Sequence, residues 1–390
     1  MQNKKILISG GGIAGLTLAY YLGKAGFSPV VIEKANSIRN GGYMIDFFSS
    51  GLFVSEDMGI IEALKAKDYG MESIQLYSAL GKKGSLVSLK GFREALDGKF
   101  FNLLRTDLVE ILYEKAKEYA DIRFSTSITS IEEHPQNLLV HFNDGTKEAF
   151  DLLIGADGLS SNVRTLCYKK EEVTRLYLGD YVAGVKHSVP LNISSQLVDS
   201  ISSPKHQVMN YSVDDKVYIS IFAFKTPLQR TLNKSEQIAL LQKEFSTFSS
   251  PVPEILSSIK TNPLYFDEVT QIRIKGSWSK NRVALVGDAA YCITLLSGQG
   301  ASMAMTGAYL LAKHLTQEKG DHSIAFKSYE TELRPFIEKM QEKAIGNANS
   351  YLPSSKFSLA LRNLLLPILF SKPFTPLLIW QLGADDFFKK

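Results

Sequence analysis

The feature that most constrains the fold of this chain is a glycine-rich stretch near its beginning, ILISGGGIAGLTLAYYLGKAGFSPVVIEK. Gly10, Gly12 and Gly15 form the pattern G-x-G-x-x-G between an apolar strand and a helix-periodic segment at residues 14–25. In such a turn the first glycine permits a tight bend, the second lets the backbone approach a pyrophosphate, and the third lets the helix pack closely on the sheet. The pattern predicts a βαβ unit that binds a dinucleotide.

Glu33 stands at the end of the next predicted strand, residues 28–33. A carboxylate about 20 residues beyond the glycines accepts hydrogen bonds from an adenosine ribose. The N-terminus of the helix at residues 14–25 offers free N–H groups and a partial positive charge to the phosphates. This arrangement favours dinucleotide binding over a merely structural turn, but it does not choose between NAD(P) and FAD.

A second glycine-rich run, VALVGDAAYCITLLSGQGASMAM, lies in the last third of the chain. Asp288 follows an apolar strand there and is placed to accept hydrogen bonds from ribityl hydroxyls. Gly298 and Gly300 open a long predicted helix, whose N-terminus would stabilise the negative charge of a reduced flavin. Alternatively, the glycines form a simple loop and Asp288 caps a helix.

A third motif, DLLIGADGLSSNVR, contains Asp157, Gly158 and Arg164 after a buried strand. The three motifs, in this order and spacing, resemble the GxGxxG, DG and GD motifs of the class A FAD-dependent monooxygenases, the group that contains para-hydroxybenzoate hydroxylase. Within that group, the stretch EKANSIRNGGYMIDF is most similar to the tetracycline-inactivating monooxygenases, the tetracycline destructases.

The resemblance implies an α/β fold: a Rossmann-like FAD-binding domain, a β-sheet-rich substrate domain and a C-terminal helix that bridges them. Alternating polar and apolar residues independently predict a β-rich lobe in the middle of the chain. The expected division is an FAD-binding domain at 1–72, 101–172 and 267–350, a hairpin at 73–100 that joins the substrate domain at 173–266, and a bridging segment at 351–390.

The resemblance also assigns cofactor contacts. It gives the ADP half of FAD to the first glycine motif and Glu33, the ribityl chain to Asp288, and a place against the flavin to Arg105. Asp157 and Gly158 match a motif that contacts both FAD and NADPH. Asp46 corresponds to an FAD contact and Arg39 to an NADPH contact, although a solvated loop charge is an equal interpretation of Arg39.

The second glycine run departs from the family pattern at three positions. Tyr291, Leu295 and Ser302 stand where the family commonly has histidine, proline and asparagine. These differences put the geometry at the flavin edge in question, and with it the efficiency of oxygen activation.

The resemblance implies an FAD- and NADPH-dependent monooxygenase that uses O2, through a flavin C4a-hydroperoxide, to oxidise a polycyclic, tetracycline-like substrate. The alternatives are an aromatic or secondary-metabolite hydroxylase, a dehydrogenase or non-oxygenating flavin reductase, and a non-catalytic FAD- or NAD-binding or membrane-surface protein. No catalytic triad or metal-ligand pattern is visible, so no catalytic residue is assigned and no metal is expected.

The substrate is expected between the β-rich lobe and the flavin. In the predicted strand KVYISIFAFK, one face carries Val217, Ile219, Ile221 and Ala223, and the other Tyr218, Ser220, Phe222 and Phe224. Either face can line a pocket or pack in the core.

The bulk composition excludes some classes of protein. A net charge of +4 is too slight to indicate nucleic-acid binding. The two cysteines, Cys167 and Cys292, have neither metal nor CxxC spacing, so we expect a cytoplasmic protein. We also expect a monomer. Arg362, Lys372 and prolines interrupt the apolar C-terminal stretch, which predicts no membrane span.

Overall fold

The computed structural model describes residues 2–38, 43–227, 232–294, 298–381 and 387–388. A six-stranded sheet of order β17-β18-β11-β1-β2-β7 forms the centre of the first lobe. Its strands are β1 (Lys5–Ser9), β2 (Ser28–Ile32), β7 (Asp121–Arg123), β11 (Leu152–Gly155), β17 (Ser279–Lys280) and β18 (Val283–Leu285). All neighbours are parallel except β17 and β18. Because β18 comes from the last third of the chain, this domain is discontinuous in sequence.

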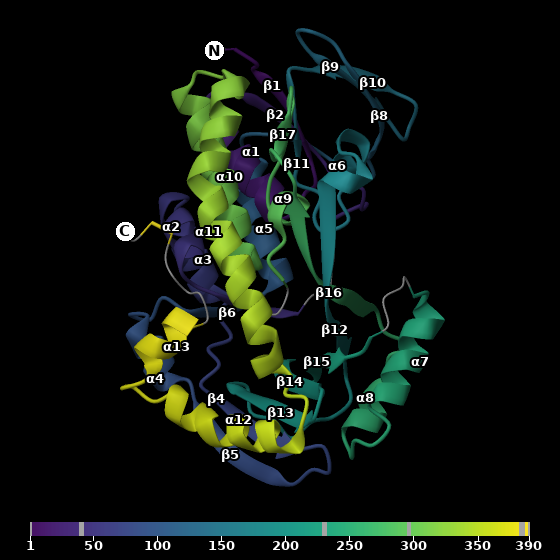
Figure 1. The fold of residues 1–390 in the computed structure, drawn as a ribbon, viewed down its shortest axis with the longest axis vertical. Helices are drawn as coiled ribbons and strands as arrows, with labels where there is room; N and C mark the ends of the chain where they lie inside the picture. The colour runs from purple at the N-terminus through teal and green to yellow at the C-terminus, as the bar shows by residue number, and fades with distance from the viewer. Residues whose placement is uncertain (1, 39–42, 228–231, 295–297, 382–386, 389–390) are drawn as a thin grey trace.

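Helices cover the six-stranded sheet, as expected for parallel strands whose runs are apolar throughout. They are α1 (Ile13–Lys24), α2 (Ser50–Asp57), α3 (Ile61–Ala66), α5 (Arg105–Ala116), α6 (Asn162–Cys167), α9 (Asp288–Tyr291), α10 (Gly300–Gln317) and α11 (His322–Tyr351). α10 packs against α1, α2 and α11. The long helices α10 and α11 lie side by side on the outside of this lobe (Figure 1).

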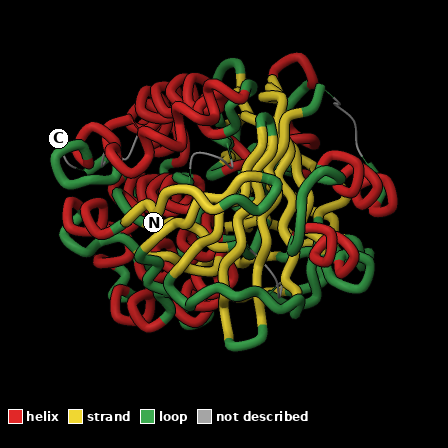
Figure 2. Tube along the Cα trace, turned by 90° about the horizontal axis from the view of Figure 1, so that it is seen from below, coloured by secondary structure: helices red, strands yellow, loops and turns green. Residues whose placement is uncertain are grey.

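A seven-stranded sheet of order β16-β12-β15-β14-β13-β4-β5 forms the second lobe. Its strands are β4 (Ser73–Ser78), β5 (Lys83–Ser88), β12 (Val173–His187), β13 (Leu197–Ser203), β14 (His206–Asp214), β15 (Val217–Lys225) and β16 (Leu264–Ile274). The predicted hairpin at 73–100 contributes β4 and β5 to this sheet, through parallel pairing of β4 with β13. Seen along the long axis of the molecule, the strands lie in the middle and the helices outside (Figure 2).

The two faces of β15 have different partners. Tyr218, Phe222 and Phe224 belong to a core shared with α7 (Lys234–Glu244) and α8 (Val252–Ser258). Ile219 and Ile221 belong to a separate core that packs toward the first lobe. Both faces are therefore buried, and the structure decides which one looks toward the cofactor domain: the face of Ile219.

Several segments join the lobes. The strands β12 and β16 run from one lobe into the other (Figure 1). In β16, Val269 packs in the second-lobe core and Ile272 in the first-lobe core. The C-terminal segment, which contains α12 (Lys356–Leu369) and α13 (Thr375–Gln381), completes the connection. Leu352, before α12, lies in the second-lobe core, and Leu378 of α13 lies in the first-lobe core.

The remaining elements are short. A three-stranded antiparallel sheet flanks the first lobe and consists of β8 (Ile128–Glu133), β9 (Leu138–Phe142) and β10 (Lys147–Phe150). A two-stranded ribbon consists of β3 (Met44–Phe47) and β6 (Phe101–Leu104). The helix α4 (Lys90–Ala95) follows β5. A turn at Asn143, Asp144 and Gly145 joins β9 to β10.

Neighbouring residues set where two helices begin. α5 begins at Arg105, directly after β6, and the Arg105 N–H donates to the Tyr43 carbonyl at 3.1 Å. Gly59, at φ +68°, separates α3 from α2.

Candidate active site

The first glycine turn is closely packed at two positions and open at the third. Gly10 has a φ of +114°, and a Cβ there would lie 2.7 Å from the carbonyl carbon of Ala156. A Cβ on Gly15 would overlap the carbonyl oxygen of Gly10. A Cβ on Gly12 would meet no atom within 4 Å, and no side chain caps the α1 N-terminus that it precedes. The turn therefore presents free N–H groups to open space, which suits a pyrophosphate.

Glu33 is anchored to this turn by two backbone hydrogen bonds. Its Oε2 accepts from the Gly11 N–H at 3.0 Å and its Oε1 from the Ala35 N–H at 2.9 Å. The side chain is half-buried. Each carboxylate oxygen has a second lone pair, so the group keeps the capacity to accept from a ribose hydroxyl.

The second glycine run meets the first directly. Gly287 has a φ of +66°, and a Cβ there would lie 3.1 Å from the Cβ of Ala14, in the first turn of α1. Asp288 follows as the first residue of α9. The two glycine runs therefore border one region, as a single extended cofactor requires.

Asp288 and Asp46 share an unusual environment. Both side chains are reached by solvent, yet surrounding protein removes enough hydration to raise the pKa of each carboxyl. The charge of Arg105 opposes this effect at Asp288, and a 2.7 Å hydrogen bond from Asn102 opposes it at Asp46. Both carboxyl groups are thus exposed to solvent on one side and crowded by protein atoms on the other.

Arg105 is exposed at the first position of α5, where its charge acts on the same region. Burial raises the pKa values of Tyr43 and Tyr265, and the charge of Arg105 partly opposes this effect at both residues. The net result for Tyr43 is a pKa raised to about 12. The ring centroids of these tyrosines are 5.1 Å apart, and the Tyr265 hydroxyl donates to Asp267 at 3.4 Å. The sequence did not single out Tyr43, Tyr265 or Asp267, since no local pattern links them.

The N-terminus of α10 is likewise open. Gln299 precedes it without a side-chain cap, and a Cβ on Gly298 or Gly300 would meet nothing within 4 Å. Ser302 faces away from this opening: it is buried, and its hydroxyl donates to the Phe48 carbonyl at 2.8 Å. This departure from the family pattern therefore anchors α10 to the segment before α2.

Asp157 uses its side chain within the protein. Its carboxylate accepts from the Ser161 hydroxyl, from the Asn162 N–H at 2.8 Å and from the Val163 N–H at 3.0 Å, at the start of α6. Its backbone adjoins the first turn, since a Cβ on Gly10 would lie 2.9 Å from the Asp157 Cα. Any contribution of Asp157 to cofactor binding is thus best expected from its backbone and from Gly158, which has a φ of +78° and open space at its Cβ position.

Arg164 and Tyr291 support the site from behind. The buried Arg164 donates to the carbonyls of Ala289 at 2.9 Å and Leu159 at 2.5 Å, and so joins the second and third motifs. Tyr291 is buried, its hydroxyl 3.3 Å from that of Tyr329. Arg39 and Leu295 lie outside the described residues.

The second lobe closes the region from the other side. The Met44 N–H, in β3, donates to the Tyr211 hydroxyl of β14 at 2.6 Å. Tyr211, Ile219, Ile221, Met209 and Tyr265 belong to or pack on one apolar cluster of this lobe. Among the described residues, no group of His, Cys, Asp or Glu side chains is arranged to hold a metal ion.

A mostly parallel sheet whose two glycine turns converge, facing a mostly antiparallel sheet rich in aromatic residues, is the arrangement of an FAD-binding oxidoreductase of two lobes. The sequence matches the family described as "FAD binding domain" over residues 3–344. It is 34% identical over 364 residues, 92% of each chain, to a flavin-dependent monooxygenase of Legionella longbeachae.

Solved structures give the same result. Tetracycline destructase Tet(51) is 30% identical with a TM-score of 0.82 over 95% of this chain and 98% of its own. Tetracycline destructase Tet(55) is 29% identical, with a TM-score of 0.84 over 96% of this chain and 98% of its own. This chain belongs to the FAD-binding monooxygenase family and is an FAD-dependent enzyme similar in fold to the tetracycline destructases. The predicted family and fold class are confirmed.

Proposed function

We propose that this enzyme uses NADPH and O2 to oxidise a polycyclic substrate with an electron-rich phenol or enol, and that it inactivates tetracyclines. The observation that carries the proposal is the apposition of the two glycine runs at Gly287 and Ala14, in a chain whose second lobe packs an apolar sheet face toward the first lobe. The fold similarity to two tetracycline destructases supports the substrate class.

The residues present fit FAD. The open turn at Gly12 would hold the pyrophosphate, Glu33 the adenosine ribose and Asp288 the ribityl chain. The N-terminus of α10, at Gly298 and Gly300, would face the flavin ring together with Arg105. We further propose FAD contacts for Asp46 and Asp157. We propose an NADPH contact for Arg39.

Bound FAD supplies a redox centre that accepts hydride from a nicotinamide and activates oxygen. The chain itself contributes position and electrostatics. The open end of α10 and the cation of Arg105 favour negative charge beside them. Tyr43, Tyr265 and the apolar face of β15 would orient a flat substrate and exclude water from it.

The deciding experiment is mass spectrometry of a tetracycline incubated with the FAD-loaded enzyme and NADPH. The proposal expects a product heavier by one oxygen atom and NADPH oxidation that rises with substrate. A set of other aromatic and polycyclic compounds should be tested in parallel. An oxygenated product from one of those alone would favour the aromatic or secondary-metabolite hydroxylase, and NADPH consumption indifferent to every compound would favour a non-oxygenating reductase.

A further inference from the structure

The helix α12 places apolar side chains on its outer face. Among the described residues, seven of the fourteen large hydrophobic side chains that are exposed belong to α12, α13 and their connection. On α12 they recur at a spacing that keeps them on one side of a helix. We call them the α12–α13 apolar face: Phe357, Leu361, Leu364, Leu365, Ile368, Phe374 and Leu377.

Several of these side chains are extensively exposed. Phe357 is 78% exposed and Leu364 66%, and no residue of α12 is fully buried. A cluster of this kind on one side of a molecule marks a surface that contacts something apolar, whereas single exposed hydrophobic residues do not.

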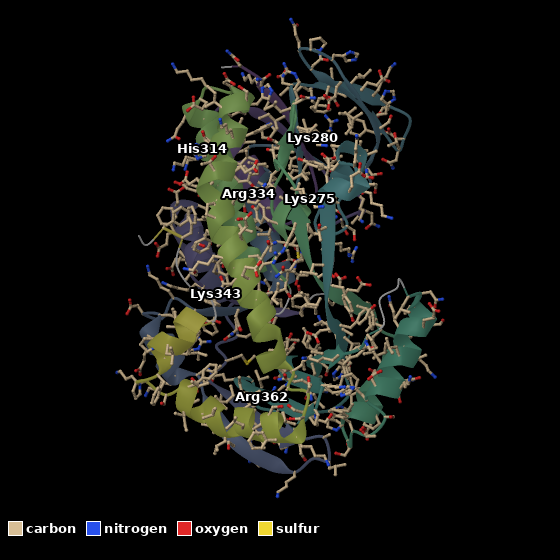
Figure 3. The ribbon with its side chains drawn as sticks, in the orientation of Figure 1. Lys275, Lys280, His314, Arg334, Lys343 and Arg362 are labelled. Atoms are coloured by element: carbon tan, nitrogen blue, oxygen red, sulfur yellow. The ribbon has the colours of Figure 1, made fainter. Side chains whose placement is uncertain are left out.

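Polar contacts hold the opposite side of α12 against the protein. The partly buried Arg362 donates to the Tyr351 carbonyl at 2.8 Å and to the Ser202 hydroxyl at 3.1 Å. Burial lowers the pKa of this guanidinium, and Asn363, beside it, accepts from the same group at 3.0 Å. The half-buried Leu359 and Leu366 lie on the same inner side, so α12 is apolar on both sides, whereas a helix on the surface of a protein in water keeps a polar side outward. Figure 3 labels Arg362 on α12, at the end of the molecule away from the N-terminus.

The charges around this face are basic. Residues 356–381 contain Lys356, Arg362 and Lys372 and no acidic residue. Lys356 and Lys372 are exposed at the two ends of α12, and the exposed Lys90 of α4 lines the same surface hollow as Lys372. Glu94 is the acidic neighbour, 3.3 Å from Lys372, in a pair that is itself solvent-exposed.

We propose that the α12–α13 apolar face docks on the surface of a membrane that carries anionic lipids. Helices that lie in the membrane interface combine Phe, Leu and Ile on one side with flanking lysines, and anionic headgroups attract those lysines. A second copy of this chain fits less well, because a twofold contact would bring the lysines of both copies around one interface. Such docking is peripheral: no described helix is long and apolar enough to cross a membrane.

The test is flotation of the FAD-loaded full chain with lipid vesicles. Binding is expected to vesicles that contain phosphatidylglycerol, weaker binding to phosphatidylcholine alone, and a decrease with added salt. The double variant Leu361→Gln/Leu364→Gln should lower the partition coefficient by about tenfold or more. Lys356→Gln/Lys372→Gln should lower binding to the anionic vesicles about fivefold per lysine.

The matched control is Leu166→Gln/Ile324→Gln, which removes two side chains, 41% and 49% exposed, from other helices. It should bind vesicles as the unaltered protein does. Flavin absorbance and thermal melting show whether each variant is folded. Binding no stronger than background, or binding that the Leu361→Gln/Leu364→Gln variant retains, would overturn the proposal. Sedimentation of a dimer that this variant disrupts, without vesicle binding, would assign the face to a second copy instead.

Discussion

At the scale of single residues, the glycines of the first turn serve different purposes. Gly10 and Gly15 are required by contacts within the protein, while Gly12 borders open space. The same distinction separates Asp157, whose carboxylate is used at the start of α6, from Asp288, whose side chain is exposed to solvent. Packing and ligand binding therefore make separable demands on residues of one motif.

Substitutions at Gly12 and Gly15 should separate these demands. Gly15→Ala forces its Cβ against the Gly10 carbonyl and should destabilise even the FAD-free protein, by about 1–3 kcal/mol. Gly12→Ala should leave the melting temperature of the FAD-free protein nearly unchanged but weaken FAD binding about tenfold or more, because the backbone can no longer approach the pyrophosphate. Melting curves and titration of FAD fluorescence measure both effects. Equal FAD affinity in Gly12→Ala and the unaltered protein would argue against a pyrophosphate at this turn.

Asp180 should make stability depend on pH. It is fully buried in β12, neither carboxylate oxygen has a hydrogen-bond partner among the described residues, and burial raises its pKa to about 6. The folded protein therefore favours the protonated form: its stabilising effect is complete below about pH 3.9, the unfolded value, and is lost as the pH rises through 6. Asp180→Asn should raise stability at pH 8 by up to about 2 kcal/mol and give no gain near pH 4.

Chemical denaturation across this pH range is the appropriate measurement for Asp180→Asn. The control is Asp215→Asn, in the exposed turn between β14 and β15. A gain for Asp180→Asn that is the same at every pH would show that the carboxyl does not titrate in this window.

At the scale of elements, close helix packing depends on single small residues. α10 reaches its neighbours through Gly307, where a Cβ would overlap the Tyr291 hydroxyl and lie 3.1 Å from its ring carbon Cζ. The same tyrosine stacks near Trp278, with ring centroids 4.6 Å apart. The position of α10, and with it the opening at Gly300, is thus fixed from behind by α9 and α11.

A double-mutant cycle tests this packing. Gly307→Ala should destabilise the protein by about 1–3 kcal/mol through overpacking. Tyr291→Phe removes the hydroxyl and should cost little alone, since its hydrogen bond to Tyr329 is long at 3.3 Å. The combined variant should be more stable than the sum of the two effects predicts. Strict additivity in denaturant unfolding would mean that the two side chains do not compete for the same space.

At the scale of the whole molecule, the two lobes should unfold together. β12, β16 and the C-terminal segment connect the lobes, and the proposed cofactor site lies where they meet. A ligand that binds only the folded state stabilises it by mass action, by about 4 kcal/mol at a thousandfold excess over Kd.

Removal of FAD should therefore lower the melting temperature of the entire chain in one transition. Calorimetry of the FAD-free and reconstituted protein measures the shift, and NADPH added to the FAD-free protein serves as a control for general nucleotide effects. Two separate transitions, with only one sensitive to FAD, would show that the lobes fold independently.

The sequence by itself determined the βαβ unit and the dinucleotide-binding turn, because strand, turn and helix signals are local and each glycine of the motif meets a local requirement of the backbone. The choice of FAD came from the resemblance of the three motifs to a known family, not from those local signals. Only the tertiary structure decided that Gly287 packs on Ala14, that the Ile219 side of β15 faces the cofactor domain, and that one apolar side of α12 stays exposed. Those outcomes depend on partners far away in the chain. Alternation or helical periodicity identifies two faces of an element, but the distant surface that packs against it selects which face is covered.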